Sequence, residues 1–174
     1  MTSIYLVRHG QASFGKKDYD NLSEIGEKQS FLLGKHFNKL KLNFDKIYVG
    51  TLKRQIQTSE QILKNYENKI NIERTQLLNE YDVKSVLTGF VNGRELTYDE
   101  LYNKKIHFSL LRNSVMAWSQ NKITYSVNET WAQFEKRAET FLNLFKETKK
   151  NNILVISSGG TISMILRLLL NLPS

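Results

Sequence analysis

The run NILVIS at residues 152–157 restricts the fold of this chain more than any other part of its sequence. Its central residues are all aliphatic, without the alternation of apolar and polar side chains that marks a strand with one face in water. A strand of this kind is buried on both faces, as in a parallel sheet with helices on both sides. Gly159 and Gly160 follow, and a helix is expected from there to about Asn171, before Pro173. The run therefore predicts an α/β fold.

Strand and helix patterns alternate through most of the remaining sequence. Short β-branched or aliphatic runs predict strands at residues 3–7, 45–50 and 69–74. Apolar residues at helical spacing predict helices at 23–40 with Ser23 as the N-cap, at 52–66, around 110–118 and at 131–145. Because strands that alternate with helices are usually parallel, we expect three layers, a mostly parallel sheet with helices on both faces.

The length of the chain suits one domain. A folded chain of 174 residues removes about 70% of its unfolded surface from water, which is enough for a single hydrophobic core. No repeat, linker or low-complexity segment divides the sequence. We therefore treat residues 1–174 as a single domain.

The composition excludes several kinds of site. Cysteine is absent, which rules out disulfides, thiolate metal sites and cysteine nucleophiles and fits a reducing cytoplasm. The amino terminus lacks the basic start and the apolar segment of a signal peptide. The apolar run at 164–170 contains Arg167 and is far shorter than the roughly 20 residues that span a bilayer. We expect a soluble, cytoplasmic protein with no membrane partner.

The net charge of +8, from 25 basic and 17 acidic residues, could attract nucleic acid or another anion. However, the lysines are dispersed along the chain, and no basic stretch alternates with aromatic residues that could stack on bases. A solvated, lysine-rich surface explains the charge, so we expect no nucleic-acid partner.

Three polar segments follow predicted strands, where the ligand sites of open α/β sheets lie. Arg8, His9 and Gly10 follow the first strand, residues 51–54 follow the second, and residues 157–160 follow the last. The last segment also begins a helix, whose unpaired N–H groups attract anions. An anionic ligand would therefore fit at this edge of the sheet.

Four segments resemble motifs of the histidine phosphatase superfamily, which includes the phosphoglycerate mutases and the small phosphohistidine phosphatases. They are LVRHGQASFG at 6–15, GTLKRQIQTSE at 50–60, LLNEYD at 77–82 and VISSGG at 155–160. Their order and spacing cover nearly the whole chain. The resemblance implies a phosphoglycerate mutase-like fold and a phosphatase without metal or cofactor, which hydrolyses a phosphomonoester or phosphohistidine through a phosphohistidine intermediate.

The resemblance also implies roles for individual residues. His9 would attack phosphorus, which a neutral imidazole can do near pH 7 without a separate base. Arg8 and Arg54 would bind the phosphoryl group, since a guanidinium donates two hydrogen bonds and stays charged. Glu80 would protonate the leaving oxygen if burial or a nearby anion raises its pKa. Asp82 competes for that role, and a plain loop carboxylate is the remaining alternative.

Two positions depart from the superfamily pattern. Most active relatives have a histidine before the paired glycines, where this chain has Ser158, and many have an asparagine where it has Gly15. A serine hydroxyl could still donate one hydrogen bond to phosphate, and it could also cap the last helix. A branch that opens with RHGQASFG shares the SSGG sequence. Ser158→His is expected to raise the rate if Ser158 only weakens the site.

The first motif offers two further contacts. Gln11 and Ser13 could touch the phosphate or the leaving group. The other histidines, His36 and His107, occupy no motif position and are expected to be structural or exposed. Residues 81–126 form the longest segment without a motif and should supply a lid and substrate selectivity.

The expected partner is a phosphorylated small molecule or a phosphoprotein. A non-catalytic module that binds phosphate or a phosphoprotein is one alternative. A phosphoglycerate mutase-type transferase is less favoured, because it must shield its intermediate from water. The sequence ends soon after the last helix, so the C-terminus is expected to be short for the superfamily. An uncovered sheet edge would then favour a homodimer.

Overall fold

The computed structural model describes residues 3–13, 20–66, 70–146 and 152–173. Within these residues four parallel strands form one sheet, in the order β1 (Ser3–Arg8), β4 (Asn152–Ser157), β2 (Lys46–Val49) and β3 (Ile72–Arg74). All four lie where the sequence predicts strands, although residue 69, the expected start of the third, lies outside the described residues. The predicted α/β fold class with a mostly parallel sheet is confirmed.

The central strand is buried on both faces, as its unbroken apolar run predicts. Leu154 and Ile156 belong to a core on one side of the sheet, and Ile153 and Val155 belong to a core on the other. None of these four side chains is exposed to solvent. β4 therefore lies inside three layers, helix, sheet and helix.

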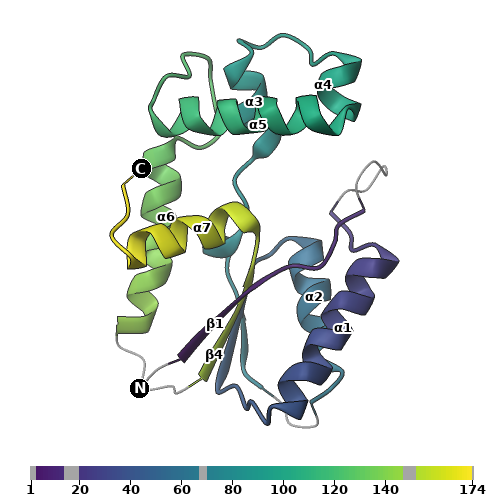
Figure 1. The fold of residues 1–174 in the computed structure, drawn as a ribbon. Coiled ribbons are helices and arrows are strands. Elements are labelled where there is room, and N and C mark those ends of the chain that lie inside the picture. Colours follow the sequence, from purple (N-terminus) through teal and green to yellow (C-terminus); the bar gives the residue numbers. More distant parts are fainter. Residues whose placement is uncertain (1–2, 14–19, 67–69, 147–151, 174) are drawn as a thin grey trace.

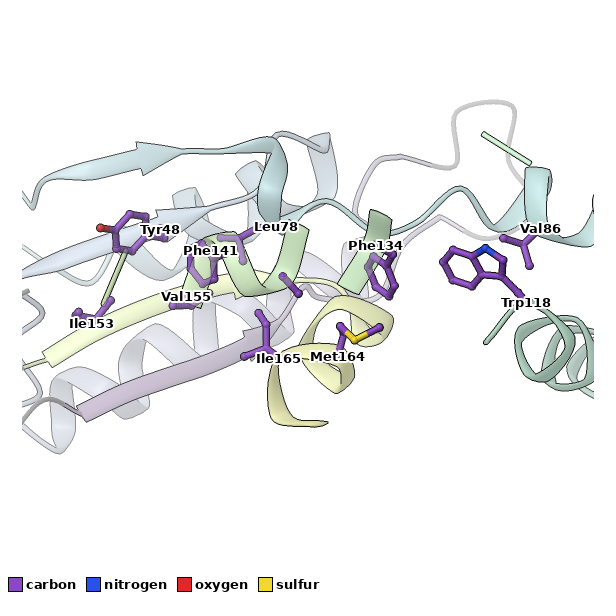
Figure 2. Close-up of a cluster of buried hydrophobic side chains, with 11 residues drawn as sticks. Tyr48, Leu78, Val86, Trp118, Phe134, Phe141, Ile153, Val155, Met164 and Ile165 are labelled. Carbon is purple, nitrogen blue, oxygen red and sulfur yellow. The ribbon is translucent and has the colours of Figure 1, made fainter. Parts of the chain in front are cut away.

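Helices cover both faces of the sheet (Figure 1). On one face α1 (Glu24–Lys39) and α2 (Lys53–Leu63) pack against Leu154 and Ile156 through Phe37 and Ile62. On the other face lie α6 (Trp131–Lys146) and α7 (Gly159–Leu169), which contribute Phe141 and Ile165. Figure 2 shows how the second core gathers side chains from the sheet and from both of these helices.

The middle of the chain forms a separate helical group beside the layers (Figure 1). It contains α3 (Val83–Phe90), α4 (Tyr98–Tyr102) and α5 (Lys104–Ser119). The sequence predicts only the last of them. α4 has five residues and no buried side chain, which is too short and too exposed to produce an apolar period. Trp118 of α5 stacks on Phe134 of α6, which joins the group to the core.

The helix boundaries agree with the sequence most closely at α1. The Ser23 hydroxyl oxygen accepts a hydrogen bond from the Gly26 N–H at 3.1 Å, so the predicted N-cap is confirmed. α2 ends at Leu63, three residues before the predicted end at 66. Among the described residues no helix combines the length and the apolar character that crossing a membrane would need.

Candidate active site

The carboxyl ends of β1, β2 and β4 are level in the sheet. Arg8 pairs with Ser157, and Val49 pairs with Ile156. The backbone N–H of His9 donates to the Ser157 carbonyl oxygen at 2.9 Å, one residue beyond β1. The polar segments that follow these strands therefore lie along one edge of the sheet, as the sequence predicts.

The His9 ring is held at both of its nitrogens. Nδ1 lies 2.7 Å from the Gly10 carbonyl oxygen, which can only accept a hydrogen bond, so Nδ1 carries the proton. Nε2 is then unprotonated, and it accepts a hydrogen bond from Arg54 Nε at 3.1 Å. The lone pair of Nε2 is thus directed to the guanidinium that the sequence assigns to phosphate.

The surroundings of His9 keep its ring uncharged. Burial, together with the positive charges of Arg54 and Arg8, lowers the pKa of His9 from 6.5 to about 4, against the opposing effect of the Gly10 carbonyl. At neutral pH the imidazole is therefore neutral, which is the form that can act as a nucleophile.

This lowered pKa predicts a pH-dependent loss of stability. Between about pH 6.5 and 4 the unfolded chain binds a proton at His9 that the folded chain does not, so stability falls as the pH decreases through this window. His9→Gln removes that contribution. We expect the melting temperature of the wild type, measured relative to His9→Gln, to decrease from pH 7 to pH 4.5. A constant difference between the two proteins across this range contradicts the lowered pKa.

Arg54 is a buried cation at the start of α2, with 8% of its surface exposed. Its Nη1 lies 2.6 Å from Asp20 Oδ1, and the other oxygen of Asp20 accepts the Lys53 backbone N–H at 2.9 Å. The same guanidinium donates to His9. Asp20 therefore fixes the guanidinium that contacts His9.

Arg8 presents a second guanidinium to the same edge. Its side chain is exposed and forms no hydrogen bond or ion pair with the other described residues. It runs beside the start of α7, where a Cβ on Gly159 would lie 3.6 Å from Arg8 Nε. Its charge also acts on His9. Arg8 can therefore donate its hydrogen bonds to an anion at His9.

Ser158 lies between β4 and α7 and is completely buried. It is the N-cap residue of α7, but its hydroxyl makes no capping hydrogen bond. Its Oγ instead accepts a hydrogen bond from Gln55 Nε2 at 2.8 Å. The cap alternative from the sequence is therefore correct for the backbone position and wrong for the side chain.

Glu80 reaches the same edge from the loop before α3. Its Oε2 accepts the Gly160 N–H at 2.9 Å, and its Oε1 accepts the Tyr81 N–H at 3.3 Å. Burial raises the pKa of Glu80, although these backbone donors and Arg54 partly offset the effect. A Cβ on Gly160 would lie 2.5 Å from Glu80 Oε1, so the second glycine of the pair provides room for this carboxyl group.

Asp82, the alternative proton donor, serves a structural purpose. Its Oδ1 accepts the Ser85 N–H at 3.0 Å as the N-cap of α3. Its Oδ2 accepts a hydrogen bond from Asn128 Nδ2 at 2.7 Å. Because both oxygens are engaged away from His9, the geometry favours Glu80 over Asp82.

The structure does not bring Gln11 into contact with the other candidate residues. Its side-chain oxygen accepts a hydrogen bond from the Ser23 hydroxyl at 2.9 Å, next to the start of α1. Ser13 is buried, and its hydroxyl donates to the Leu22 carbonyl oxygen. Gly15 lies outside the described residues. Gln11 and Ser13 thus support the loop after β1, and neither side chain forms a hydrogen bond with His9.

Among the residues that the structure describes, the remaining histidines and acidic side chains form no second centre. His36 is exposed in the last turn of α1, and Nδ1 of His107 lies 2.7 Å from the Glu100 carbonyl oxygen. In the parts of the chain that the structure describes, no group of three or more His, Asp or Glu side chains could hold a metal ion.

Three residues near the site were not singled out from the sequence. They are Asp20, Gln55 and Thr58. The Thr58 hydroxyl accepts the Gly10 N–H at 3.1 Å and donates to the Arg54 carbonyl oxygen at 2.7 Å. Thr58 thus ties the first motif to the second. Gln55 and Thr58 lie inside the segment GTLKRQIQTSE, which is the signal that could have identified them.

Comparison with known proteins matches nearly the whole chain to one family. The model of the histidine phosphatase superfamily (branch 1) matches residues 4–174. A candidate phosphoserine phosphatase of Hydrogenobacter thermophilus is 27% identical over 175 residues, which are 97% of this chain and 79% of that protein. A broad-specificity phosphatase of Saccharomyces cerevisiae is 27% identical over 173 residues, which are 94% of this chain and 68% of that protein.

Solved structures share the fold. YhfR of Bacillus stearothermophilus superposes with a TM-score of 0.72 at 19% identity, over 99% of this chain and 82% of that one. The α-ribazole phosphatase of Shigella flexneri gives a TM-score of 0.68 at 20% identity, over 98% of this chain and 80% of that one. These likenesses confirm the expected phosphoglycerate mutase-like architecture.

Proposed function

Since this chain belongs to the histidine phosphatase superfamily (branch 1), we propose that it is a phosphatase that hydrolyses phosphate esters through a phosphohistidine at His9. The state of the His9 ring carries the proposal, because Nε2 is unprotonated, uncharged and adjacent to Arg54. The matched relatives that are named as phosphatases support the same class of reaction.

The first half-reaction transfers the phosphoryl group to the enzyme. The lone pair of His9 Nε2 attacks phosphorus, the N–P bond forms, and the bond between phosphorus and the ester oxygen breaks. Glu80 gives its proton to the departing oxygen, so an alcohol leaves. Arg8, Arg54 and the Ser158 hydroxyl donate hydrogen bonds to the phosphoryl oxygens, whose negative charge two guanidinium groups can neutralise.

The second half-reaction returns the enzyme to its starting state. Water attacks the phosphorus, the Glu80 carboxylate accepts its proton, and the N–P bond breaks. Inorganic phosphate leaves, and His9 regains the lone pair on Nε2. While the ring is phosphorylated it carries a positive charge, which the Gly10 carbonyl oxygen stabilises through the Nδ1 proton.

The substrate in this proposal is a phosphomonoester or phosphohistidine, in a small molecule or a phosphoprotein. The helical group α3–α5 is the element that would cover the site and select the substrate. It adjoins the proton donor through Tyr81, whose ring centre lies 5.0 Å from that of Trp118 in α5. This group lies within residues 81–126, the segment that the sequence predicts to supply the lid.

The proposed function is tested by phosphate release in the presence of a chelator. We expect the purified chain to release inorganic phosphate from an aryl phosphate in excess EDTA. Binding of phosphate in a calorimeter with no turnover would instead identify a non-catalytic module and overturn the proposal. Isomerisation of a phosphorylated sugar acid without release of phosphate would identify a transferase and overturn it equally.

A further inference from the structure

The Ser158 hydroxyl is a buried donor whose own proton has no acceptor among the residues that the structure describes. No part of Ser158 is exposed, and its single side-chain hydrogen bond is the one that it accepts from Gln55 Nε2 at 2.8 Å. Buried hydroxyl groups nearly always use their proton, because an unused polar group costs free energy in the interior. The proton of Ser158 is therefore available for a further hydrogen bond.

Gln55 is fixed so firmly that the direction of this contact is settled. It is fully buried in the first turn of α2, and its Nε2 also donates to the Leu78 carbonyl oxygen at 3.0 Å. Its Oε1 accepts the Leu52 N–H at 3.3 Å. If the amide were rotated by 180°, Oε1 would face the Leu78 carbonyl oxygen, and two acceptors would oppose each other. Nε2 must therefore face Ser158, so Ser158 accepts and keeps its own proton free.

The position of Ser158 gives that proton a target. The residue before it receives the His9 N–H, and the two residues after it lie beside Arg8 and Glu80. Ser158 thus lies in the chain between residues that contact His9, Arg8 and Glu80, the groups that bind and transfer the phosphoryl group in the proposed reaction.

We propose that Gln55 is a positioning residue that acts through Ser158: by donating to the serine oxygen it directs the hydroxyl proton to a phosphoryl oxygen. This inference rests on the proposed phosphatase function. It also changes the expectation for Ser158→His, because the Gln55 amide lies against Oγ and occupies space that an imidazole would need. Gln55 and Ser158 act as one unit in this site, which histidine at position 158 alone would disrupt.

A double-mutant cycle tests whether Gln55 acts through Ser158. Ser158→Ala is expected to lower kcat by about 10- to 100-fold, the rate equivalent of a hydrogen bond to a charged group. Gln55→Met keeps the volume but cannot donate, and the Leu78 carbonyl oxygen retains the Ser157 hydroxyl as a donor. We expect Gln55→Met to lower kcat by about 5- to 50-fold, and the double variant to be no slower than Ser158→Ala.

The controls separate positioning from a structural effect. Gln57→Met removes another glutamine of α2, which donates to Asn21 and accepts the Leu22 N–H but does not contact Ser158, so its effect should multiply with that of Ser158→Ala. Gln55→Asn keeps an amide that is too short to reach Ser158 and should reproduce the loss if Gln55→Met does not fold. Losses that multiply in the Gln55 cycle, or a Gln55→Met variant as fast as the wild type, overturn the inference.

A binding measurement keeps this inference distinct from the proposed function. The same cycle is run on the dissociation constant of inorganic phosphate, measured by calorimetry with the wild type and the three variants. If the wild type has no turnover, the proposed function fails. The inference about Gln55 and Ser158 is still supported if both single variants bind phosphate more weakly and the double variant binds it no more weakly than Ser158→Ala. If turnover is present and the effects of the two substitutions multiply in both cycles, the inference about Gln55 and Ser158 fails and the proposed phosphatase function stands.

Discussion

His9→Ala is expected to lower turnover by more than about 1000-fold, because it removes the atom to which the phosphoryl group is transferred. The neutral ring between the Gly10 carbonyl oxygen and Arg54 has no substitute among the described residues near it. The measurement is phosphate release from an aryl phosphate at pH 7, with circular dichroism to show that the variant is folded.

The matched control for this variant is His36→Ala. His36 is exposed in the last turn of α1 and occupies no motif position, so His36→Ala should keep turnover within about 2-fold of the wild type. If His9→Ala retained more than a tenth of the wild-type rate, water would be attacking the substrate directly. That result contradicts covalent catalysis by His9.

Glu80→Gln is expected to slow the first half-reaction according to the leaving group. An alkyl oxygen needs a proton as it departs, so its single-turnover release should fall by about 100- to 10,000-fold. A nitrophenolate leaves without a proton, so its release should fall by less than about 10-fold. Equal losses for the two substrates would show that Glu80 is needed for structure and does not donate the proton.

The pH dependence gives Glu80→Gln a second readout. Burial raises the pKa of Glu80, and a bound phosphoryl dianion would raise it further. The protonated carboxyl group is the active form, so the rate of alkyl release by the wild type should decline as the pH rises through this pKa. Glu80→Gln should lack that decline. Asp82→Asn is the matched control: the amide oxygen of asparagine can still accept the Ser85 N–H that caps α3, so we expect the pH profile to stay unchanged.

The sequence predicts those parts of the fold that depend on long regular patterns. The run at 152–157 predicts a strand buried on both faces, and Ser23 predicts the start of α1, because burial and capping act on neighbouring residues. The short helix α4 leaves no comparable pattern, since its side chains are all at least partly exposed. α4 therefore cannot be predicted from a hydrophobic period.

At the candidate site, the sequence predicts which residues follow the strands but not how their side chains pair. Gln55 and Ser158 are 103 residues apart, and their hydrogen bond exists only because α2 begins at the edge of the sheet where β4 ends. The pairing of Arg54 with Asp20 depends in the same way on the path of the chain after β1. The contact of Gln11 with Ser23 instead of the ligand edge has the same origin.

The most direct measurement is the capture of the phosphorylated protein itself. The wild type is mixed with a ³²P-labelled substrate and quenched in alkali, in which a phosphorus–nitrogen bond survives, and the labelled peptide is mapped by mass spectrometry. We expect phosphorus on Nε2 of His9, with Nδ1 excluded by its proton, which is bonded to the Gly10 carbonyl oxygen. Rapid phosphate release with no labelled protein, or a label on any other residue, would contradict it.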